Sequence, residues 1–331
     1  TYKPETELHQ DMQHEVAGAV EHDYESPGKP WIQVLSWSPR AFVYHNFLSK
    51  GEVRHILKLA RPLMKRSMVV GPNDTGVMDD VRTSAGTFLP RNQDKVIAAL
   101  ERRLSIWSQM PVSHQEDLQV LRYGPTNKYG AHCDGLGRVM SVLIYLIEPD
   151  EGGETAFPQS KQWLHPEMGE PTQGEFSKCA KGHVAYKPKQ GDALMFFDMT
   201  PDYAGEDLMS EHTGCPVIRG TKWNAVKWIH GSPFHPDEYK AAMAKDPYDP
   251  GLLTDPGICN NLHPQCQVWA DAGECTRNPD YMVGHTDGRG MCRLACKDCE
   301  ECAYDDEPCL QRNRETAGFM TIDTAEFKGL L

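Results

Sequence analysis

The feature that most constrains this chain is the uneven placement of its cysteines. Of the 11 cysteines, only Cys133, Cys179 and Cys215 precede residue 259, and the remaining eight lie between Cys259 and Cys309. Such density in a short segment is typical of a module that disulfides stabilise and that is made in an oxidising compartment. The chain therefore divides into a large part that must build its own core and a small part held by cross-links.

A zinc cluster is the alternative for the small part, because the run C-R-L-A-C-K-D-C-E-E-C at 292–302 has the short spacings of metal-binding cysteines. No second C-x-x-C pair follows at the distance of a zinc ribbon, which favours disulfides. Asn73 begins a glycosylation sequon beside a Gly-Pro turn, which also fits a secretory route. We therefore expect the protein in the lumen of the endoplasmic reticulum or Golgi, or outside the cell.

The bulk composition narrows the partners. The chain has 331 residues, enough for one large and one small domain, and its net charge of −13 argues against a nucleic-acid-binding surface. No apolar run approaches the roughly 18 residues of a membrane span. The sequence starts at Thr1 rather than Met, which is compatible with a signal peptide or anchor removed in front of it.

The first third of the chain predicts strands followed by helices. Residues 1–30 are polar without a sustained period and are expected to form a flexible stem, after which IQVLSW and AFVYHNF predict two strands. Ser49 and Glu52 have the spacing of a capping box, opening a helix that must end before Pro62. A second helix is expected from about Gln93 to Trp107.

Strand patterns dominate the region that follows. Short segments rich in β-branched and aromatic residues are separated by Gly and Pro turns: DLQVLRYG, RVMSVLIYLIE, HVAYKP, DALMFF and KWNAVKWIHG. HPDEYKAAMAK predicts a last short helix. Helices first and strands afterwards favour an α+β fold in which helices back a sheet sandwich or barrel.

Residues 129–135, YGAHCDG, place a histidine and a carboxylate two positions apart. In an extended chain His132 and Asp134 leave the same face, so that their ligand atoms converge, whereas Cys133 faces the other way and is expected to be a buried free thiol. Two histidines and one carboxylate with open positions form the facial triad of non-haem Fe(II) oxygenases. H-x-D alone is common, and an ordinary polar loop is the alternative.

A second polar group lies further along the chain. His212 is followed ten residues later by Lys222, which opens a strand that puts Lys222, Trp228 and His230 on one face. This face suits the wall of a polar pocket better than a core, although a solvated edge strand is the alternative.

These pieces together resemble one family. H-x-D, a later His and a Lys ten residues further are similar to the pattern of 2-oxoglutarate/Fe(II) dioxygenases of the prolyl 4-hydroxylase family. The surrounding words resemble the plant and algal type over roughly residues 31–235: DVRTSAGTF (80–88), EGGETAFP (151–158), GDALMFF (191–197) and GCPVIRGTKWNAVKWIH (214–230).

The resemblance implies a double-stranded β-helix, or jelly roll, and a set of roles. Fe(II) is expected on His132, Asp134 and His212, with Lys222 binding the far carboxylate of the co-substrate 2-oxoglutarate and Tyr123 and Thr155 assisting through hydroxyl groups. His132, Asp134, His212 and Lys222 would be the catalytic set. Ascorbate is a further implied cofactor. The implied reaction hydroxylates peptidyl proline at C4, consuming O2 and releasing succinate and CO2.

The resemblance also implies a peptide groove. The aligned positions are Arg82, Ser84, Glu116, Tyr129, Arg138, Trp228 and His230. Tyr129 and Trp228 suit packing on a proline ring, and hence a ligand in polyproline II conformation; a surface ion pair of Arg82 with Glu116, and a turn aromatic at Tyr129, are the alternatives.

The expected substrate is a proline-rich secreted or cell-wall-type glycoprotein rather than a collagen-like repeat. Only three residues separate Asp134 from Arg138, where plant-type members carry a longer loop, so the peptide grip is expected to differ from theirs.

The cysteine-rich segment resembles the ShK toxin-like domain, on CNNLHPQCQVWADAGECTRNPDYM and the later CRLACKDC. Its six cysteines permit 15 pairings from spacing alone. The resemblance implies Cys259–Cys299, Cys266–Cys292 and Cys275–Cys296. Cys302 with Cys309, and Cys179 with Cys215, are candidates for two further bridges.

The expected domains are a stem at 1–30, a dioxygenase domain at 31–245, a linker at 246–258, the ShK-like module at 259–299 and a tail at 300–331. Two other functions stay open: a related dioxygenase acting on lysine or a small molecule, and a secreted binding protein whose oxygenase fold is inactive. The complete His-Asp-His-Lys set argues against the inactive protein.

Overall fold

The computed structural model describes residues 29–67, 69–70, 76–77, 83–244, 255–284, 290–303 and 305–330. These residues form two compact units. The sheet unit takes the described residues within 1–57, 67–249 and 325–331, and the cysteine-rich unit takes those within 58–66 and 250–324. Most of the predicted stem and most of the predicted linker lie outside the described residues, and the predicted domain boundaries stay a prediction.

The two predicted helices form where local signals place them. Glu52 N–H donates to Ser49 Oγ (3.2 Å) and Ser49 N–H donates to the Glu52 carboxylate (2.9 Å), so the capping box is confirmed and opens α2 (Lys50–Ala60). α3 (Lys95–Ser108) begins slightly later than expected, because the Asp94 carboxylate caps it by accepting from the N–H groups of Val96 and Ile97.

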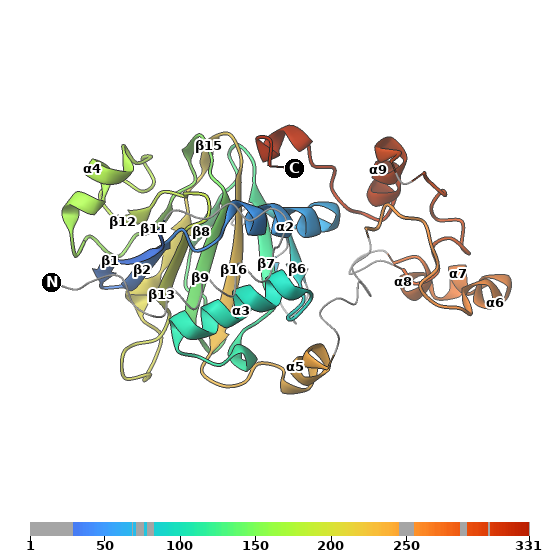
Figure 1. Ribbon diagram of the computed structural model, residues 1–331, viewed down its shortest axis with the longest axis horizontal. Helices are drawn as coiled ribbons and strands as arrows, with labels where there is room; N and C mark the ends of the chain where they lie inside the picture. The colour runs from blue at the N-terminus through green and yellow to red at the C-terminus, as the bar shows by residue number, and fades with distance from the viewer. Residues whose placement is uncertain are drawn as a thin grey trace. The chain divides into compact units, whose positions relative to one another are not determined.

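Two antiparallel sheets make the centre of the sheet unit (Figure 1). Within this unit the major sheet has the order β1 (Trp31–Trp37), β2 (Arg40–His45), β13 (Ala193–Phe197), β9 (Arg138–Ile147), β16 (Lys222–His230), β7 (Leu118–Tyr123) and β6 (Ala85–Leu89). The minor sheet has the order β12 (Val184–Tyr186), β11 (Thr155–Phe157), β14 (His212–Gly214) and β8 (Tyr129–His132).

The inner faces of the two sheets share one core. Leu143 and Phe196 from the major sheet pack in the same buried cluster as Phe157 and Val184 from the minor sheet. This arrangement confirms the predicted α+β jelly-roll class. A cavity between two sheets is where such a fold can hold a ligand.

α2 and α3 cover the outer face of the major sheet (Figure 1). Lys227 of β16 points toward α3 and its Nζ lies 2.7 Å from Glu101 Oε1, with both side chains almost completely buried. Arg103 of α3 pairs with Glu52 of α2. β16 therefore presents Lys227 to the helices and leaves the alternate residues for the interior, as the two-residue period predicts.

The other described elements of the sheet unit are short. They are β4 (Val69–Val70), β5 (Gly76–Val77), β10 (Glu151–Gly152), β15 (Val217–Arg219), α4 (Glu170–Gln173) and α5 (Pro236–Met243). Short 3-10 turns lie at Val112–His114, Pro166–Met168, Leu208–Ser210 and Thr324–Phe327. No helix in the described ranges is long and apolar enough to cross a membrane.

Disulfides dominate the cysteine-rich unit. Its short helices are α6 (Cys266–Asp271), α7 (Glu274–Arg277), α8 (Pro279–Met282) and α9 (Glu307–Thr316), and the unit also includes the 3-10 turn Arg61–Leu63 and β3 (Lys65–Arg66). The bridges are Cys259–Cys299, Cys266–Cys292, Cys275–Cys296 and Cys302–Cys309. The pairing implied by the ShK-like resemblance is therefore confirmed, and the zinc alternative is wrong because these cysteines are bonded to one another.

Candidate active site

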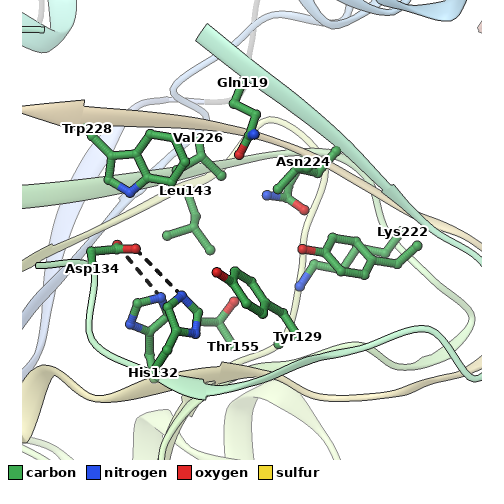
Figure 2. Close-up of a pocket in the computed structure, with 14 residues that line it drawn as sticks. Gln119, Tyr129, His132, Asp134, Leu143, Thr155, Lys222, Asn224, Val226 and Trp228 are labelled. Carbon is green, nitrogen blue, oxygen red and sulfur yellow. Dashed lines mark ion pairs between the residues drawn. The ribbon is translucent and has the colours of Figure 1, made fainter. Parts of the chain in front are cut away.

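Strand pairing brings together two histidines that lie far apart in the sequence. β8 and β14 are antiparallel neighbours, and His132 and His212 are direct partners in their register. His212 is the first residue of β14. Asp134 follows the end of β8 and turns back toward the two imidazoles (Figure 2).

The three side chains have the geometry of ligands to one ion. His132 Nε2 lies 3.6 Å from Asp134 Oδ1, and His212 Nε2 lies 3.8 Å from Asp134 Oδ2. One ligand atom from each residue lies within 4.8 Å of the other two. Metal bonds to nitrogen and oxygen of about 2.0–2.2 Å fit inside such a triangle, so the residues fit a metal centre.

Each imidazole is oriented by the carbonyl of a nearby residue. His132 Nδ1 donates to Gly130 O (2.8 Å) and His212 Nδ1 donates to Ser210 O (3.1 Å). A carbonyl only accepts, so the proton is assigned to Nδ1 and the lone pair of Nε2 is free for a metal. Burial lowers the pKa of His212 to about 4, which keeps this ring neutral at pH 7.

The Asp134 carboxylate is held from behind by a chain of hydrogen bonds. Burial alone would raise its pKa, but His212, His132 and Ser141 together lower the pKa well below its usual range. Ser141 Oγ lies 2.5 Å from Asp134 Oδ2 and 2.9 Å from Asp198 Oδ2. One hydroxyl proton cannot serve two carboxylates at once, and burial followed by the charge of Asp134 raises the pKa of Asp198, which favours the protonated form of Asp198.

A cavity extends from the triad to Lys222 at its other end (Figure 2). Lys222 is only 3% exposed and its Nζ donates to Gly153 O (2.7 Å). Burial lowers the pKa of Lys222 to about 8, against the opposing charge of Glu154. A buried ammonium hydrogen-bonded to a carbonyl is suited to bind an anion, because a carboxylate would pair with it directly.

The cavity wall around Lys222 carries hydroxyl and amide groups. Tyr123 is the register partner of Lys222, and the Lys222 ammonium lies 5.5 Å from its ring centre. Thr155 is fully buried and accepts from the Tyr145 hydroxyl (3.0 Å). Both predicted hydroxyl residues therefore line the cavity, together with the amides of Gln119 and Asn224.

Most of the predicted groove residues meet at the metal end. The Glu116 carboxylate accepts from Arg138 Nε (2.7 Å) and lies 2.8 Å from His230 Nε2. The Arg138 guanidinium stacks over the ring of Trp228 at 3.9 Å, and Trp228 lines the cavity. Tyr129 also lines it and stacks on His132, with ring centres 3.8 Å apart.

The predicted roles of Ser84 and Arg82 and the predicted burial of Cys133 are not confirmed. Ser84 does not line the cavity: it is buried and its Oγ donates to Ser67 Oγ (2.9 Å). Arg82 and the sequon residue Asn73 lie outside the described residues. Cys133 is a free thiol as expected, but it is half-exposed rather than buried, because β8 ends at His132 and strand alternation stops there.

One bridge anchors the sheet that holds the histidines. Cys215 directly follows β14 and pairs with Cys179, which confirms this candidate disulfide. Cys215 N–H also donates to Glu154 O (2.8 Å). The bridge therefore fixes the chain just beyond His212 and next to Glu154, whose charge acts on Lys222.

Sequence signals missed several residues of the site. The local sequence around Ser141 and Asp198 is apolar and predicts core positions. The sequence around Tyr145 and Asn224 predicts strand and gives no sign of a site. The two-residue period of β16 was the available signal for Asn224, since that residue shares its face with Lys222 and Trp228. No local signal pointed to Asp198.

Comparison with known proteins gives consistent results. The model of the 2OG-Fe(II) oxygenase superfamily matches residues 118–230. The chain is 40% identical over 280 residues to "Probable prolyl 4-hydroxylase 4" of Arabidopsis thaliana, covering 81% of this chain and 88% of the relative. It is 41% identical over 280 residues to "Prolyl 4-hydroxylase 2" of the same plant, covering the same shares.

A solved structure is also similar at a greater distance. It is the viral collagen prolyl hydroxylase of Paramecium Bursaria Chlorella virus-1 in complex with 2OG, with 23% identity and a TM-score of 0.42. The match covers 57% of this chain and 94% of that chain.

Proposed function

The chain belongs to the plant-type prolyl 4-hydroxylases of the 2OG-Fe(II) oxygenase superfamily, and we propose that it hydroxylates peptidyl proline at C4 with Fe(II), O2 and 2-oxoglutarate. One observation carries the proposal: the His132, Asp134 and His212 ligand set and the buried Lys222 lie at opposite ends of one cavity. 2-Oxoglutarate has a metal-chelating keto acid at one end and a carboxylate at the other, so its two ends match the two ends of the cavity.

The residues at the metal end would hold Fe(II) through His132 Nε2, Asp134 and His212 Nε2. When bound, Fe(II) with 2-oxoglutarate supplies the oxidising chemistry that puts one oxygen atom of O2 on proline and the other in succinate, with loss of CO2. Three protein ligands leave coordination positions for co-substrate and oxygen. Ser141 and Asp198 keep the Asp134 carboxylate in place, as groups behind a ligand commonly do.

At the other end, Lys222 would bind the far carboxylate of the co-substrate. Its ammonium is desolvated, so an incoming anion gains more from the charge than it would at a wet surface. Tyr123 and Thr155 line the wall beside it, and Tyr145 fixes the Thr155 hydroxyl. These contacts would set the depth of the co-substrate and therefore the position of its keto acid end.

The peptide would enter at the metal end of the cavity. Tyr129 and Trp228 offer aromatic surfaces on which a proline ring can pack, and a polyproline II chain loses little conformational entropy on binding. Glu116 braces that side through its ion pair with Arg138 and its contact with His230 Nε2. The proposed substrates are proline-rich secreted or cell-wall-type glycoproteins.

The proposed location is the lumen of the secretory pathway or the cell exterior. The five disulfides support it, because structural disulfides are rare in the cytosol. Ascorbate is the proposed reductant that keeps the iron in the Fe(II) state during turnover.

A peptide panel tests the proposal. The full chain is incubated with Fe(II), 2-oxoglutarate and ascorbate and with proline-rich, collagen-like or lysine-containing peptides; products are located by fragmentation mass spectrometry and succinate is measured in parallel. We expect one added oxygen atom on proline for each succinate formed, and none with His132→Ala. Hydroxylation confined to lysine, or oxidation of a free amino acid alone, would refute the proline assignment.

A further inference from the structure

The last described residues, Ala325–Leu330, pack within the sheet unit (Figure 1). The Glu326 carboxylate accepts from Arg122 through two hydrogen bonds, one of them from Nε to Oε2 at 2.8 Å. Trp223 Nε1 donates to the same carboxylate at 3.3 Å. Phe327 is fully buried, with its ring centre 5.4 Å from that of Trp223.

These contacts lie directly behind the Lys222 end of the cavity. Trp223 pairs with Arg122 in the ladder of β16 and β7, and the next pair is Lys222 with Tyr123. Successive residues of a strand point to opposite faces. Glu326 and Phe327 therefore contact the outer face of the major sheet at the point where its inner face carries Lys222.

The Lys222 end of β16 begins directly after a turn. Lys222 is the first residue of the strand and follows a turn at Gly220, where φ is +81°. The pairing of β16 with β9 is irregular between Trp223 and Asn224. Side-chain packing against the outer face therefore adds to the backbone pairing in fixing the end of the strand.

The same segment also grips the loop that supplies the partner of Lys222. Lys328 Nζ donates to Asp150 Oδ1 (3.0 Å) and to Glu148 O (3.2 Å). The chain runs from Asp150 through β10 to Gly153, whose carbonyl accepts from Lys222. Strand end and loop are thus both tied to Ala325–Leu330.

We propose that Ala325–Leu330 positions Lys222 for the co-substrate, with Glu326 and Phe327 acting through Arg122 and Trp223. The inference rests on the proposed function, because it assigns to Lys222 the binding of 2-oxoglutarate. None of the described residues of the segment lines the cavity, so these residues are positioning residues rather than ligands of the co-substrate.

The test compares variants of the full chain. Phe327→Ala and Glu326→Arg should each raise the Kd and KM for 2-oxoglutarate roughly tenfold, at the lower end of the effect typical of residues behind a ligand. Fe(II) affinity and kcat at saturating 2-oxoglutarate should stay within about twofold of the parent. Combining Glu326→Arg with Arg122→Glu should restore most of the affinity, because the ion pair is rebuilt in reverse.

A matched control separates positioning from general loss of stability. Val96→Ala removes buried methyl groups from α3, away from the cavity, and should lower the melting temperature while leaving 2-oxoglutarate affinity unchanged. If Phe327→Ala fails to fold, Lys328→Ala removes a half-exposed ion pair to Asp150 and one hydrogen bond to Glu148 O, and should weaken 2-oxoglutarate binding about twofold.

Unchanged 2-oxoglutarate affinity in folded Phe327→Ala and Glu326→Arg would overturn the inference, whatever happens to their melting temperatures. Equal affinity in the single and double charge variants would overturn the role of the ion pair. The binding measurements need no peptide, so failure of the proline assignment in the peptide panel leaves this test intact.

Discussion

The two units of this protein bury polar groups in different ways. The sheet unit surrounds its core with two sheets and places inside it a lysine, an aspartate and a histidine that are each at least nine-tenths buried: Lys222, Asp134 and His212. The cysteine-rich unit, in its described part, has four disulfides and a buried Arg293 whose guanidinium bonds to Asp298 and to the carbonyls of Pro256 and Asn313.

The difference shows where the chemistry lies. Arg293 is satisfied by its own unit, as a structural buried charge should be. Lys222 has one carbonyl partner in a cavity, and the triad leaves two imidazole lone pairs facing a carboxylate. A large core is stable enough to bury polar groups that are not fully paired, whereas a small unit needs its disulfides to stay folded.

The largest effect should come from removing a metal ligand. Asp134→Ala should lower hydroxylation at least ten-thousandfold, about 5.5 kcal/mol of barrier, because the iron loses its carboxylate ligand. The melting temperature of the metal-free protein should fall modestly, because Ser141 and the two histidines stabilise the charged carboxylate in the folded state. Turnover assays and calorimetry check both; a lower melting temperature with retained turnover would mean that Asp134 is a structural residue.

Breaking the buried ion pair of the sheet unit should have the reverse profile. Glu101→Gln leaves the ammonium of Lys227 without its counter-charge and should destabilise the unit by about 3–5 kcal/mol. The Kd for 2-oxoglutarate at low temperature should be unchanged, because Lys227 faces α3 rather than the cavity. Denaturant unfolding gives the free energy of unfolding, and ligand titration gives the Kd. A large change in Kd would contradict the assignment of Lys227 to the helix side of the sheet and not to the cavity.

Removing a cross-link should affect only the cysteine-rich unit. Replacing Cys266 and Cys292 together by serine should cost that unit about 2–4 kcal/mol and open it to proteases. Turnover of short peptides should persist. Mass spectrometry of the proteolysis products shows which unit is cleaved. Cleavage confined to the sheet unit would contradict the claim that this disulfide stabilises the cysteine-rich unit.

The smallest effect concerns pH. The pKa of Lys222 in the ligand-free protein is lowered to about 8 from its usual value, so the ammonium is charged below pH 8 and loses its proton above it. Binding of the 2-oxoglutarate carboxylate requires the charged form, and affinity should therefore fall as pH rises, approaching tenfold per unit (about 1.4 kcal/mol) above pH 8. Lys222→Arg, if it binds, should remove this dependence; equal pH profiles would exclude Lys222 as the titrating group.

Local patterns explain what the sequence predicted well. The capping box of Ser49 and Glu52 and the alternation along β16 depend on neighbouring residues, so spacing reveals them. The triad was found because His132 and Asp134 are two apart and the family resemblance supplied His212.

The remaining features depend on contacts between distant segments. The register that puts His212 opposite His132 comes from pairing β14 with β8, and no local pattern fixes it. Asp198 and Ser141 meet only because β13 lies beside β9. The sequence predicted only a tail at 300–331, because the burial of Phe327 depends on its packing against the distant Trp223.

Anaerobic titration of 2-oxoglutarate into the Fe(II)-loaded protein tests the central claim most directly, because an α-keto acid that chelates Fe(II) absorbs visible light. We predict an absorption band that saturates at one 2-oxoglutarate per chain and is absent without iron and in His212→Ala. In Lys222→Ala the band should appear only at higher 2-oxoglutarate concentration, because the free energy of binding is weaker by about 1.5–3 kcal/mol. A titration that is identical with and without iron, or identical in the parent and Lys222→Ala, would contradict the account.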